Sequence, residues 1–204
     1  DKGPERSAQR NFGAENAKGK YILYLDADMI LSENVVSECV TNAEKDGFIG
    51  LYIPEIIVGS GFWIKVRNFE RSFYNTTCID AVRFILRKKF WEIGGFDLSM
   101  TGPEDWDLDR RLNEKGKLGI IASILFHNEG AFNLRKYISK KGYYAKSFDI
   151  YIKKWGNRDN IVRKQMGLWY RYFGVFLEKG KWKYILKHPI LCFGMYWLRL
   201  LTGI

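Results

Sequence analysis

The sequence predicts an α/β domain with a mixed sheet flanked by helices, followed by a basic segment that contains only helices. Over residues 5–126, short apolar runs alternate with amphipathic helical patterns, which is typical of a layered α/β domain. From residue 134 onward, apolar residues recur at helical spacing without a strand pattern. A chain of 204 residues has room for one domain and such an appendage.

The first elements follow from helix and strand signals. Pro4 can precede a helix over residues 5–18, which Gly19 ends, and the apolar run over 21–25 indicates a buried strand. Ser32 is a good N-cap for a second helix, and Gly47 would end that helix. The apolar face of this helix would carry Val35, Val36, Cys39, Val40 and Ala43.

The remaining elements are expected at shorter intervals. A helix over 62–74 would turn Phe62, Val66, Phe69 and Phe73 inward. The other expected strands are 48–53, 82–86 and 119–126, and the other expected helices are 88–93, 104–112, 134–141, 143–155, 161–178 and 181–201. Acids open the helix at 104 and bases follow them, which suits the helix dipole.

The net charge of +10 is unevenly distributed. Residues 133–204 contain 16 Lys and Arg against 3 Asp and Glu, which gives +13, and the other 132 residues contain 17 against 20, which gives −3. The two parts therefore have different partners. Three widely spaced cysteines and a polar N-terminus indicate a reducing, cytoplasmic location without a disulfide scaffold, a zinc site or a secretory signal.

Asp26 and Asp28 follow the apolar run, at the sheet edge where open α/β sheets bind ligands. In an extended chain, residues two apart project to one side, so both carboxylates would face one point. With no Lys or Arg next to them, a hard cation such as Mg²⁺ or Mn²⁺ would relieve their repulsion and carry substrate phosphates. The alternative is that Asp-X-Asp forms a turn or a helix cap.

Two further features indicate a site. Gly94-Gly95-Phe96-Asp97 and Gly102-Pro103-Glu104-Asp105 combine glycines, which let the backbone approach a ligand, with carboxylates at a helix start that could act as a base. The alternative is that Glu104 and Asp105 only cap the helix. His127, expected just beyond the strand at 119–126, is either structural or a metal ligand.

These motifs resemble those of a known family. Ser7-Ala8-Gln9-Arg10-Asn11-Phe12-Gly13, running into Gly19-Lys20 and the strand that ends in Asp26-Ala27-Asp28, resembles the middle of an inverting GT-A glycosyltransferase of the family-two type. Gly94-Gly95-Phe96-Asp97 and Glu104-Asp105-Trp106-Asp107-Leu108 with Arg111-Leu112 resemble its acceptor loop and catalytic-base motif. The resemblance spans residues 4–130, in the order of the family.

The resemblance implies a fold, an activity and roles for residues. Residues 1–132 would be the second half of a GT-A catalytic domain, because the nucleotide-binding units that open such enzymes have no counterpart here, and residues 133–204 would be an appendage. Asp105 would be the catalytic base. The acceptor would contact Glu104, Gly94, Gly95, Phe96, Asp97 and Trp106, and the donor would contact Arg10, Asn11, Asp26 and Asp28. Asp28, His127 and Asp26 would form the Mn²⁺ or Mg²⁺ site.

The expected reaction is inverting transfer of a sugar from a nucleotide-sugar donor to a glycan or lipid-linked acceptor, in polysaccharide or glycoconjugate biosynthesis. Two alternatives remain: a haloacid-dehalogenase-like phosphatase, although Ile30 stands where those enzymes carry Thr or Val, and a non-catalytic fragment that binds a membrane or a partner. The tail, with Trp182, Tyr184, Tyr196 and Trp197 among its bases, fits an anionic membrane surface at the cytoplasmic face. It is too apolar for nucleic acid.

Overall fold

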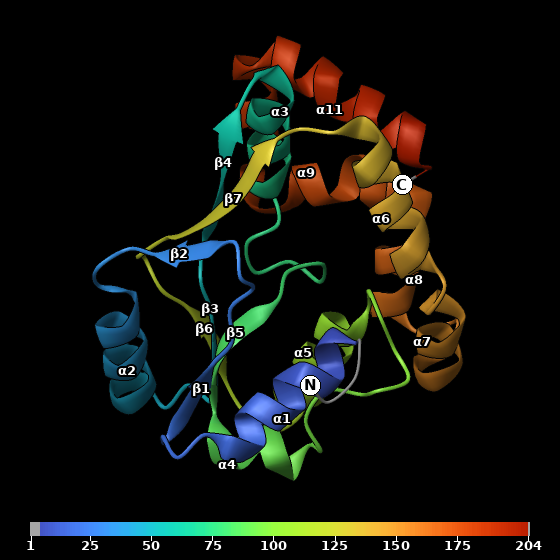
Figure 1. Ribbon diagram of the computed structural model, residues 1–204. Helices are drawn as coiled ribbons and strands as arrows, with labels where there is room; N and C mark the ends of the chain where they lie inside the picture. Colours follow the sequence, from blue (N-terminus) through green and yellow to red (C-terminus); the bar gives the residue numbers. More distant parts are fainter. Residues whose placement is uncertain (1–4, 204) are drawn as a thin grey trace.

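The structure is a computed structural model that describes residues 5–203, so the predicted placement of Pro4 lies outside the described residues. Its larger sheet has the strand order β1-β5-β3-β6 (Figure 1). Strand β5 (Val82–Leu86) runs antiparallel to β1 (Tyr21–Leu23) and β3 (Gly50–Tyr52), whereas β3 and β6 (Leu118–Ile120) are parallel. The predicted mixed sheet is confirmed.

A second sheet has the order β2-β7-β4. Strand β7 (Leu125–Ala131) pairs antiparallel with β2 (Met29–Leu31) and parallel with β4 (Glu55–Ser60). The single strand expected over 119–126 is therefore wrong, because the chain leaves the larger sheet after Ile120 and enters the smaller one at Leu125. This change of sheet places His127 inside a strand, opposite Met29, and not beyond a strand end.

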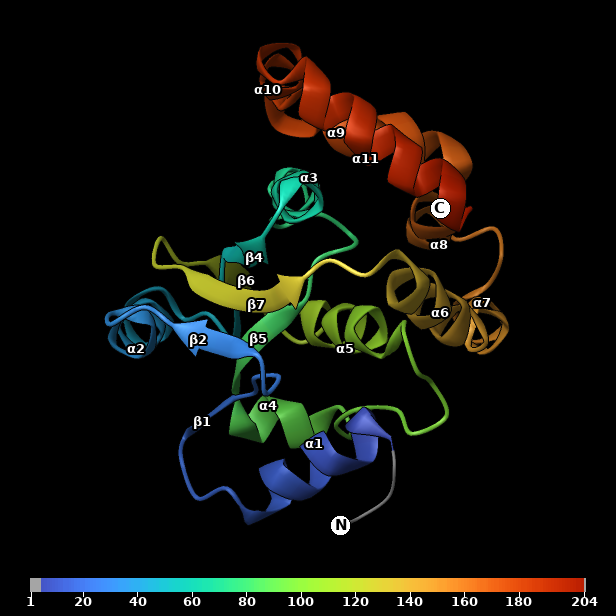
Figure 2. The same ribbon diagram turned by 45° about the horizontal axis from the view of Figure 1, so that its top comes forward.

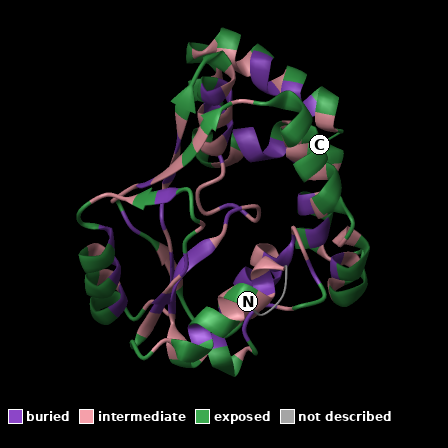
Figure 3. Cartoon of the chain, viewed as in Figure 1, coloured by how far each residue is buried: buried purple, intermediate pink, exposed green. Residues whose placement is uncertain are grey.

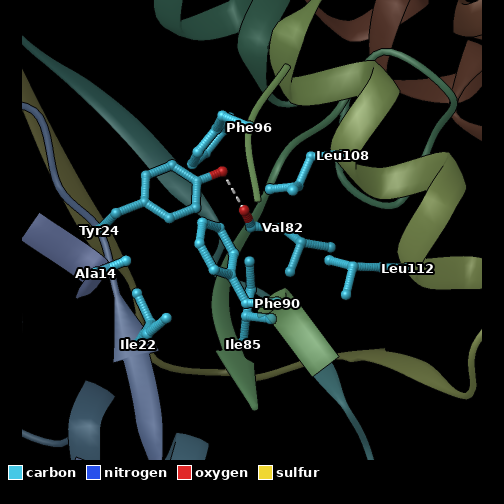
Figure 4. Close-up of a cluster of buried hydrophobic side chains, with 9 residues drawn as sticks. All are labelled: Ala14, Ile22, Tyr24, Val82, Ile85, Phe90, Phe96, Leu108 and Leu112. Carbon is cyan, nitrogen blue, oxygen red and sulfur yellow. Dashed lines mark hydrogen bonds between the residues drawn. The ribbon is translucent and has the colours of Figure 1, made fainter. Parts of the chain in front are cut away.

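Helices cover both faces of the larger sheet. On one face α1 (Arg6–Asn16), α4 (Arg87–Glu92) and α5 (Glu104–Asn113) enclose a core centred on Tyr24, Phe90 and Phe96, drawn in Figure 4. The Tyr24 hydroxyl donates a hydrogen bond to the carbonyl of Val82, which joins the chain after β1 to β5. On the other face, Val35, Cys39 and Ala43 of α2 (Val35–Asp46) pack against sheet residues that include Leu51 and Phe84.

The C-terminal segment is helical from Leu134, as predicted. Its helices are α6 (Leu134–Ala145), α7 (Phe148–Trp155), α8 (Asn160–Met166), a π-helical turn (Tyr170–Gly174), α9 (Val175–Leu177), a 3₁₀ turn (Glu178–Gly180), α10 (Trp182–Lys187) and α11 (Pro189–Thr202). They share a core with α3 (Phe62–Arg71), in which Val66, Phe69 and Phe73 contact Phe176, Met195 and Leu198. Figure 2 shows α3 between the smaller sheet and α9–α11. The boundary at residue 132 stays a prediction.

Burial alternates along the amphipathic helices (Figure 3). Gly47 ends α2 in the left-handed conformation, as predicted, with φ of 70°. Three expected core positions are wrong, because Val36, Val40 and Phe62 are 49%, 37% and 42% exposed. Within residues 5–203, every helix is too short or too polar to cross a bilayer.

Candidate active site

A cavity of about 1050 Å³ opens between α1, the segment that follows β1, and α6. Its lining includes Arg10, Asp26, Asp28 and His127, which the sequence predicted as site residues. It also includes Arg6, Lys140 and Tyr144, which belong to no motif in the sequence. The cavity therefore combines residues from the N-terminal part of the chain with residues from β7 and α6.

Asp26 forms an ion pair with Arg10. Strand β1 ends at Leu23, and the backbone carbonyl of Asp26 accepts a hydrogen bond from the amide of Met29 at 3.1 Å, which closes a turn. Arg10 Nη2 donates to Asp26 Oδ1 at 2.7 Å. Burial raises the pKa of Asp26, but the charge and hydrogen bond of Arg10, with further guanidinium groups nearby, lower it overall. The expectation of two carboxylates on an extended strand without a neighbouring base is wrong here.

Asp28 faces a histidine. Its Oδ2 lies 3.2 Å from Nε2 of His127, because β2 and β7 pair with Met29 opposite His127. The other ring nitrogen of His127, Nδ1, lies 2.9 Å from Oε1 of Glu55, at the start of β4. The hydrogen bond to Glu55, with the charges of Glu55 and Asp28, raises the pKa of His127. Burial raises the pKa of Glu55, but His127, Arg71 and Arg83 lower it overall.

The donor atoms at Asp28 and His127 fit a cation that takes its other ligands from a substrate. Within residues 5–203, no group of three or more His, Cys, Asp and Glu side chains is arranged to hold a metal. A carboxylate, however, suits both Mg²⁺ and Mn²⁺, whose sites phosphate oxygens complete, whereas the imidazole favours the transition-metal ion Mn²⁺ over Mg²⁺. Metal-binding histidines commonly present their second nitrogen to a carboxylate, as His127 does to Glu55.

Asp105, the predicted base, lies on the far side of Arg10 from Asp26. Arg10 Nη1 donates to Asp105 Oδ1 at 3.1 Å, and the Tyr24 hydroxyl is 3.4 Å from the same oxygen. The Asp105 side chain is 21% exposed, so solvent or a substrate can reach it. One guanidinium group thus fixes the distance between the predicted base and the Asp-X-Asp segment.

Glu104 is buried, at 1% exposure. Its Oε1 accepts a hydrogen bond from Arg6 Nη2 at 2.7 Å, and its Oε2 accepts one from the amide of Gly102. Burial and the neighbouring charge of Asp105 raise the pKa of Glu104, and Arg6 opposes this shift. Of the two carboxylates in the predicted base motif, Asp105 is the more accessible one.

The glycine loop, Gly94-Gly95-Phe96-Asp97, is hydrogen-bonded to α1. Gly94 and Gly95 have φ of 82° and 68°, a region that favours glycine. Asn11, predicted to bind the donor, donates from Nδ2 to the carbonyl of Phe96 at 2.8 Å and accepts from its amide at 2.9 Å. A Cβ on Gly95 would lie 2.7 Å from Asn11 Oδ1, so this loop and α1 require glycine there. Asn11 thus joins two elements, and Phe96 is buried in the core.

Asp97 and Trp106, predicted near the acceptor, contact the C-terminal helices. Asp97 Oδ2 pairs with Lys154 Nζ at 2.8 Å. Burial raises the pKa of Asp97, but hydrogen bonds from Lys154 and Ser99 lower it to about 2. Trp106 packs against Phe148 with a ring separation of 6.0 Å. Neither residue lines the 1050 Å³ cavity.

The sequence missed Glu55, Arg6 and the α6 residues for different reasons. Glu55 follows Pro54 in a stretch without a clear periodicity, so its strand was not expected. Lys140 and Tyr144 look like ordinary members of a basic amphipathic helix, and only the packing of α6 brings them to the cavity. The pairing of Arg6 and Arg10 with acids about 95 residues away has no sequence signal either.

Comparison with known proteins bears on this site. Residues 2–100 match the family model of glycosyl transferase family 2. The match covers just under half of the chain and supports a family 2 glycosyltransferase domain, and with it glycosyl transfer. The mixed sheets flanked by helices are consistent with a GT-A-like fold. No curated protein matches the chain.

The matched region contains α1, the Asp-X-Asp segment and the glycine loop. Asp105 and His127 lie beyond it. The roles predicted for these two residues therefore rest on the resemblance, on the position of His127 at the cavity and on the contact of Asp105 with Arg10.

Proposed function

We propose that this domain transfers a sugar, with inversion, from a nucleotide-diphosphate donor to a hydroxyl group of a glycan or lipid-linked acceptor. The observation that carries this proposal is the arrangement around Arg10, in a chain that matches a glycosyltransferase family. Arg10 lines the cavity beside Asp26 and also contacts Asp105, which lies behind Arg10 and is not among the residues that line the cavity. A cavity of about 1050 Å³ is at the upper end of the usual size of ligand pockets, about 300–1,000 Å³.

Asp28 and His127 would hold Mn²⁺ or Mg²⁺ at this cavity, with Asp26 near the donor. The bound cation would neutralise charge on the leaving diphosphate. Glu55 orients the imidazole so that Nε2 faces Asp28. Asp28→Asn should abolish metal-dependent turnover and leave the thermal unfolding transition unchanged, whereas normal activity in that variant would remove Asp28 from the site.

Asp105 would take the proton of the acceptor hydroxyl as its oxygen bonds to the anomeric carbon and the bond from that carbon to the diphosphate oxygen breaks. Arg10, 10% exposed, holds the carboxylate in place from one side. Asp105→Asn should lower turnover by about 10²–10⁴-fold, the usual contribution of a general base, and leave donor binding unchanged.

The matched control is Glu104→Gln. Glu104 is enclosed by Arg6 and the Gly102 amide, so this change should affect acceptor KM and stability more than kcat. The reaction should be followed in the complete enzyme with a panel of nucleotide sugars and Mn²⁺. If the two variants exchange phenotypes, Glu104 is the base. Release of phosphate from simple esters would favour a phosphatase, and failure to bind any nucleotide sugar would favour a non-catalytic role.

The enzyme would work at the cytoplasmic face of a membrane, lying on its surface. Three apolar side chains along α10 and α11, Leu186, Ile190 and Phe193, are 71%, 72% and 73% exposed. Lys183 lies three residues before Leu186 and Lys187 directly follows it, so this segment combines apolar and basic groups. Sedimentation with anionic vesicles should weaken as salt increases, and an absence of sedimentation at low salt would contradict the membrane contact.

A further inference from the structure

A network of buried ion pairs joins α3, β7 and α11. Arg67 pairs with Glu129 at 2.9 Å and with Glu70 at 3.2 Å, and Arg199 pairs with Glu70 at 2.8 Å. All four side chains are at most 20% exposed. The network therefore contains two guanidinium groups and two carboxylates, and its net charge is zero.

Two more cations lie beside this network without a carboxylate of their own. Among the described residues, neither Lys141 of α6 nor Arg171 of the π-helical turn has an acid within ion-pair distance. The contacts found for them are with aromatic rings: the Lys141 amine is 5.6 Å from the centre of the Tyr137 ring, and the Arg171 guanidinium is 5.9 Å from that of Trp106. No ion pair therefore offsets the charge of either of these two half-buried side chains.

Both of these cations line one cavity of about 330 Å³, separate from the candidate active site. Its walls come from α5, α6, the start of α7, α8, the π-helical turn and the end of α11. The remaining lining is mostly apolar: Trp106 and Phe148 stack at 6.0 Å with 18° between their planes, and Met166 and Leu168 also line the cavity. The cavity has a cationic part and an aromatic, aliphatic part.

An unpaired charge beneath the surface is costly unless a counter-ion accompanies it. The effect is visible at Lys141, whose pKa falls to about 7 through burial and the charges of Arg67, Arg171 and Arg199, although Glu70 opposes the shift. Tyr137, on the same helix, contributes no charge at neutral pH, because burial and the nearby Glu70 raise its pKa. An anion in the cavity would compensate both unpaired cations.

We propose that this cavity is a second ligand site that binds an amphiphilic anion, with a phosphate or carboxylate group between Lys141 and Arg171 and an apolar body against Trp106, Phe148 and Met166. Its volume is at the low end of ligand pockets, which suits a small molecule or the end of a single-chain lipid. Leu168, which lines the cavity, is 67% exposed, so a ligand would enter past an apolar rim. The site is independent of the proposed sugar transfer.

The test is direct binding to the full chain by calorimetry at pH 6, where Lys141 is charged. Octyl phosphate, kept below its micelle concentration, is the probe. It should bind saturably with one molecule per chain, more tightly than inorganic phosphate, which lacks the apolar body, and than octanol, which lacks the charge. Tighter binding to vesicles with phosphatidic acid than to soluble octyl phosphate would identify a lipid as the source of the anion.

The variants Lys141→Met and Arg171→Met should each weaken the binding of octyl phosphate at least tenfold. Lys146→Met is the matched control, because Lys146 follows α6 but does not line the cavity, and it should bind normally. A second readout is the pKa of Lys141 by NMR, which should rise when octyl phosphate binds. If a charge variant does not fold, Trp106→Phe serves as a further test. This variant keeps an aromatic side chain in the cavity wall, so it should bind octyl phosphate with an affinity within a few-fold of that of the wild type.

Three results would overturn the proposal. One is the absence of saturable binding of octyl phosphate to the folded chain. Another is binding that all three lysine and arginine variants leave unchanged or weaken equally. The third is a Lys141 pKa that does not respond to the ligand.

Discussion

The Asp107→Asn substitution tests how strongly the C-terminal helices stabilise α5, the helix that carries the predicted base Asp105. Asp107 is fully buried in α5 and accepts hydrogen bonds from Arg111 Nε at 2.8 Å and Trp155 Nε1 at 2.9 Å. Lys154 Nζ lies 2.8 Å from the same carboxylate. Asparagine keeps the shape but loses the charge, and it turns an amide group toward these donors.

Removing one partner of a buried ion pair costs about 3–5 kcal/mol. Arg111 and Lys154 are 16% and 33% exposed, so solvent screening reduces the effect at Asp107. We expect a loss of about 2–3 kcal/mol. For a domain of this size, that loss lowers the melting temperature by roughly 4–12 °C.

The assay is thermal unfolding followed by circular dichroism and by calorimetry. The matched control is Asp46→Asn, an exposed acid at the end of α2, which should change the free energy of unfolding by less than about 0.5 kcal/mol. A melting temperature of the Asp107 variant equal to that of the control would refute the reasoning. Two separate transitions, only one of them shifted, would show that residues 133–204 unfold as an appendage.

Three further predictions concern the packing of Gly102, the hydrogen bond from Glu55 to His127 and the protonation of Lys141. Gly102→Ala should cost at least about 2 kcal/mol in unfolding free energy, because Gly102 has φ of 107° and a Cβ there would lie 2.7 Å from the Tyr144 backbone carbonyl; an unchanged melting temperature would contradict that packing. Glu55→Gln should raise the Mn²⁺ concentration for half-maximal turnover by about 10–100-fold, because His127 loses the carboxylate that orients it, and an unchanged metal response would exclude this role. For Lys141, whose pKa is lowered from 10.5 to about 7, the unfolded chain binds the extra proton between these values, so stability relative to Lys141→Met should rise as the pH increases from about 7 to 10. We expect a rise of up to about 3 kcal/mol, because the side chain is only half-buried and solvent screens its charge. Denaturant titrations of both proteins that change in parallel would count against it.

The sequence predicted those elements of the fold whose signals are local. Helix α2 ends at Gly47, which adopts a left-handed conformation, and α5 begins at the acids that predicted a helix start. The smaller sheet escaped prediction because its strands pair across long sequence distances, with Leu31 opposite Leu125 and Glu55 beside the same residue. Short strands whose partners lie about 70–95 residues away carry no periodicity that distinguishes them from loops.

The candidate site was predicted in part for the same reason. Asp26, Asp28 and Arg10 share one cavity because the helix-to-strand step that contains them is continuous in sequence. Asn11 directly follows Arg10 in the same helix, but its side chain binds the Phe96 backbone, and a sequence pattern cannot distinguish these orientations. The role of Glu55 depends on a parallel strand pair, which only the three-dimensional structure reveals.

The C-terminal helices contribute to the candidate active site through the segment that carries the predicted base. Thr101, just before Gly102, donates from its amide to Ser147 Oγ at 3.1 Å, and Asp107, just after Asp105, is held by Trp155. Contacts with α7 and its N-cap residue thus flank Asp105 on both sides in the sequence, whereas Arg10 holds its carboxylate from α1. A base on a helix start needs its backbone fixed as well as its side chain, because a shift of about 1 Å at a catalytic group can cost about 10²-fold in rate. The segment from Ser147 to Trp155 is therefore part of what positions the predicted base, whatever surface the outer faces of the C-terminal helices contact.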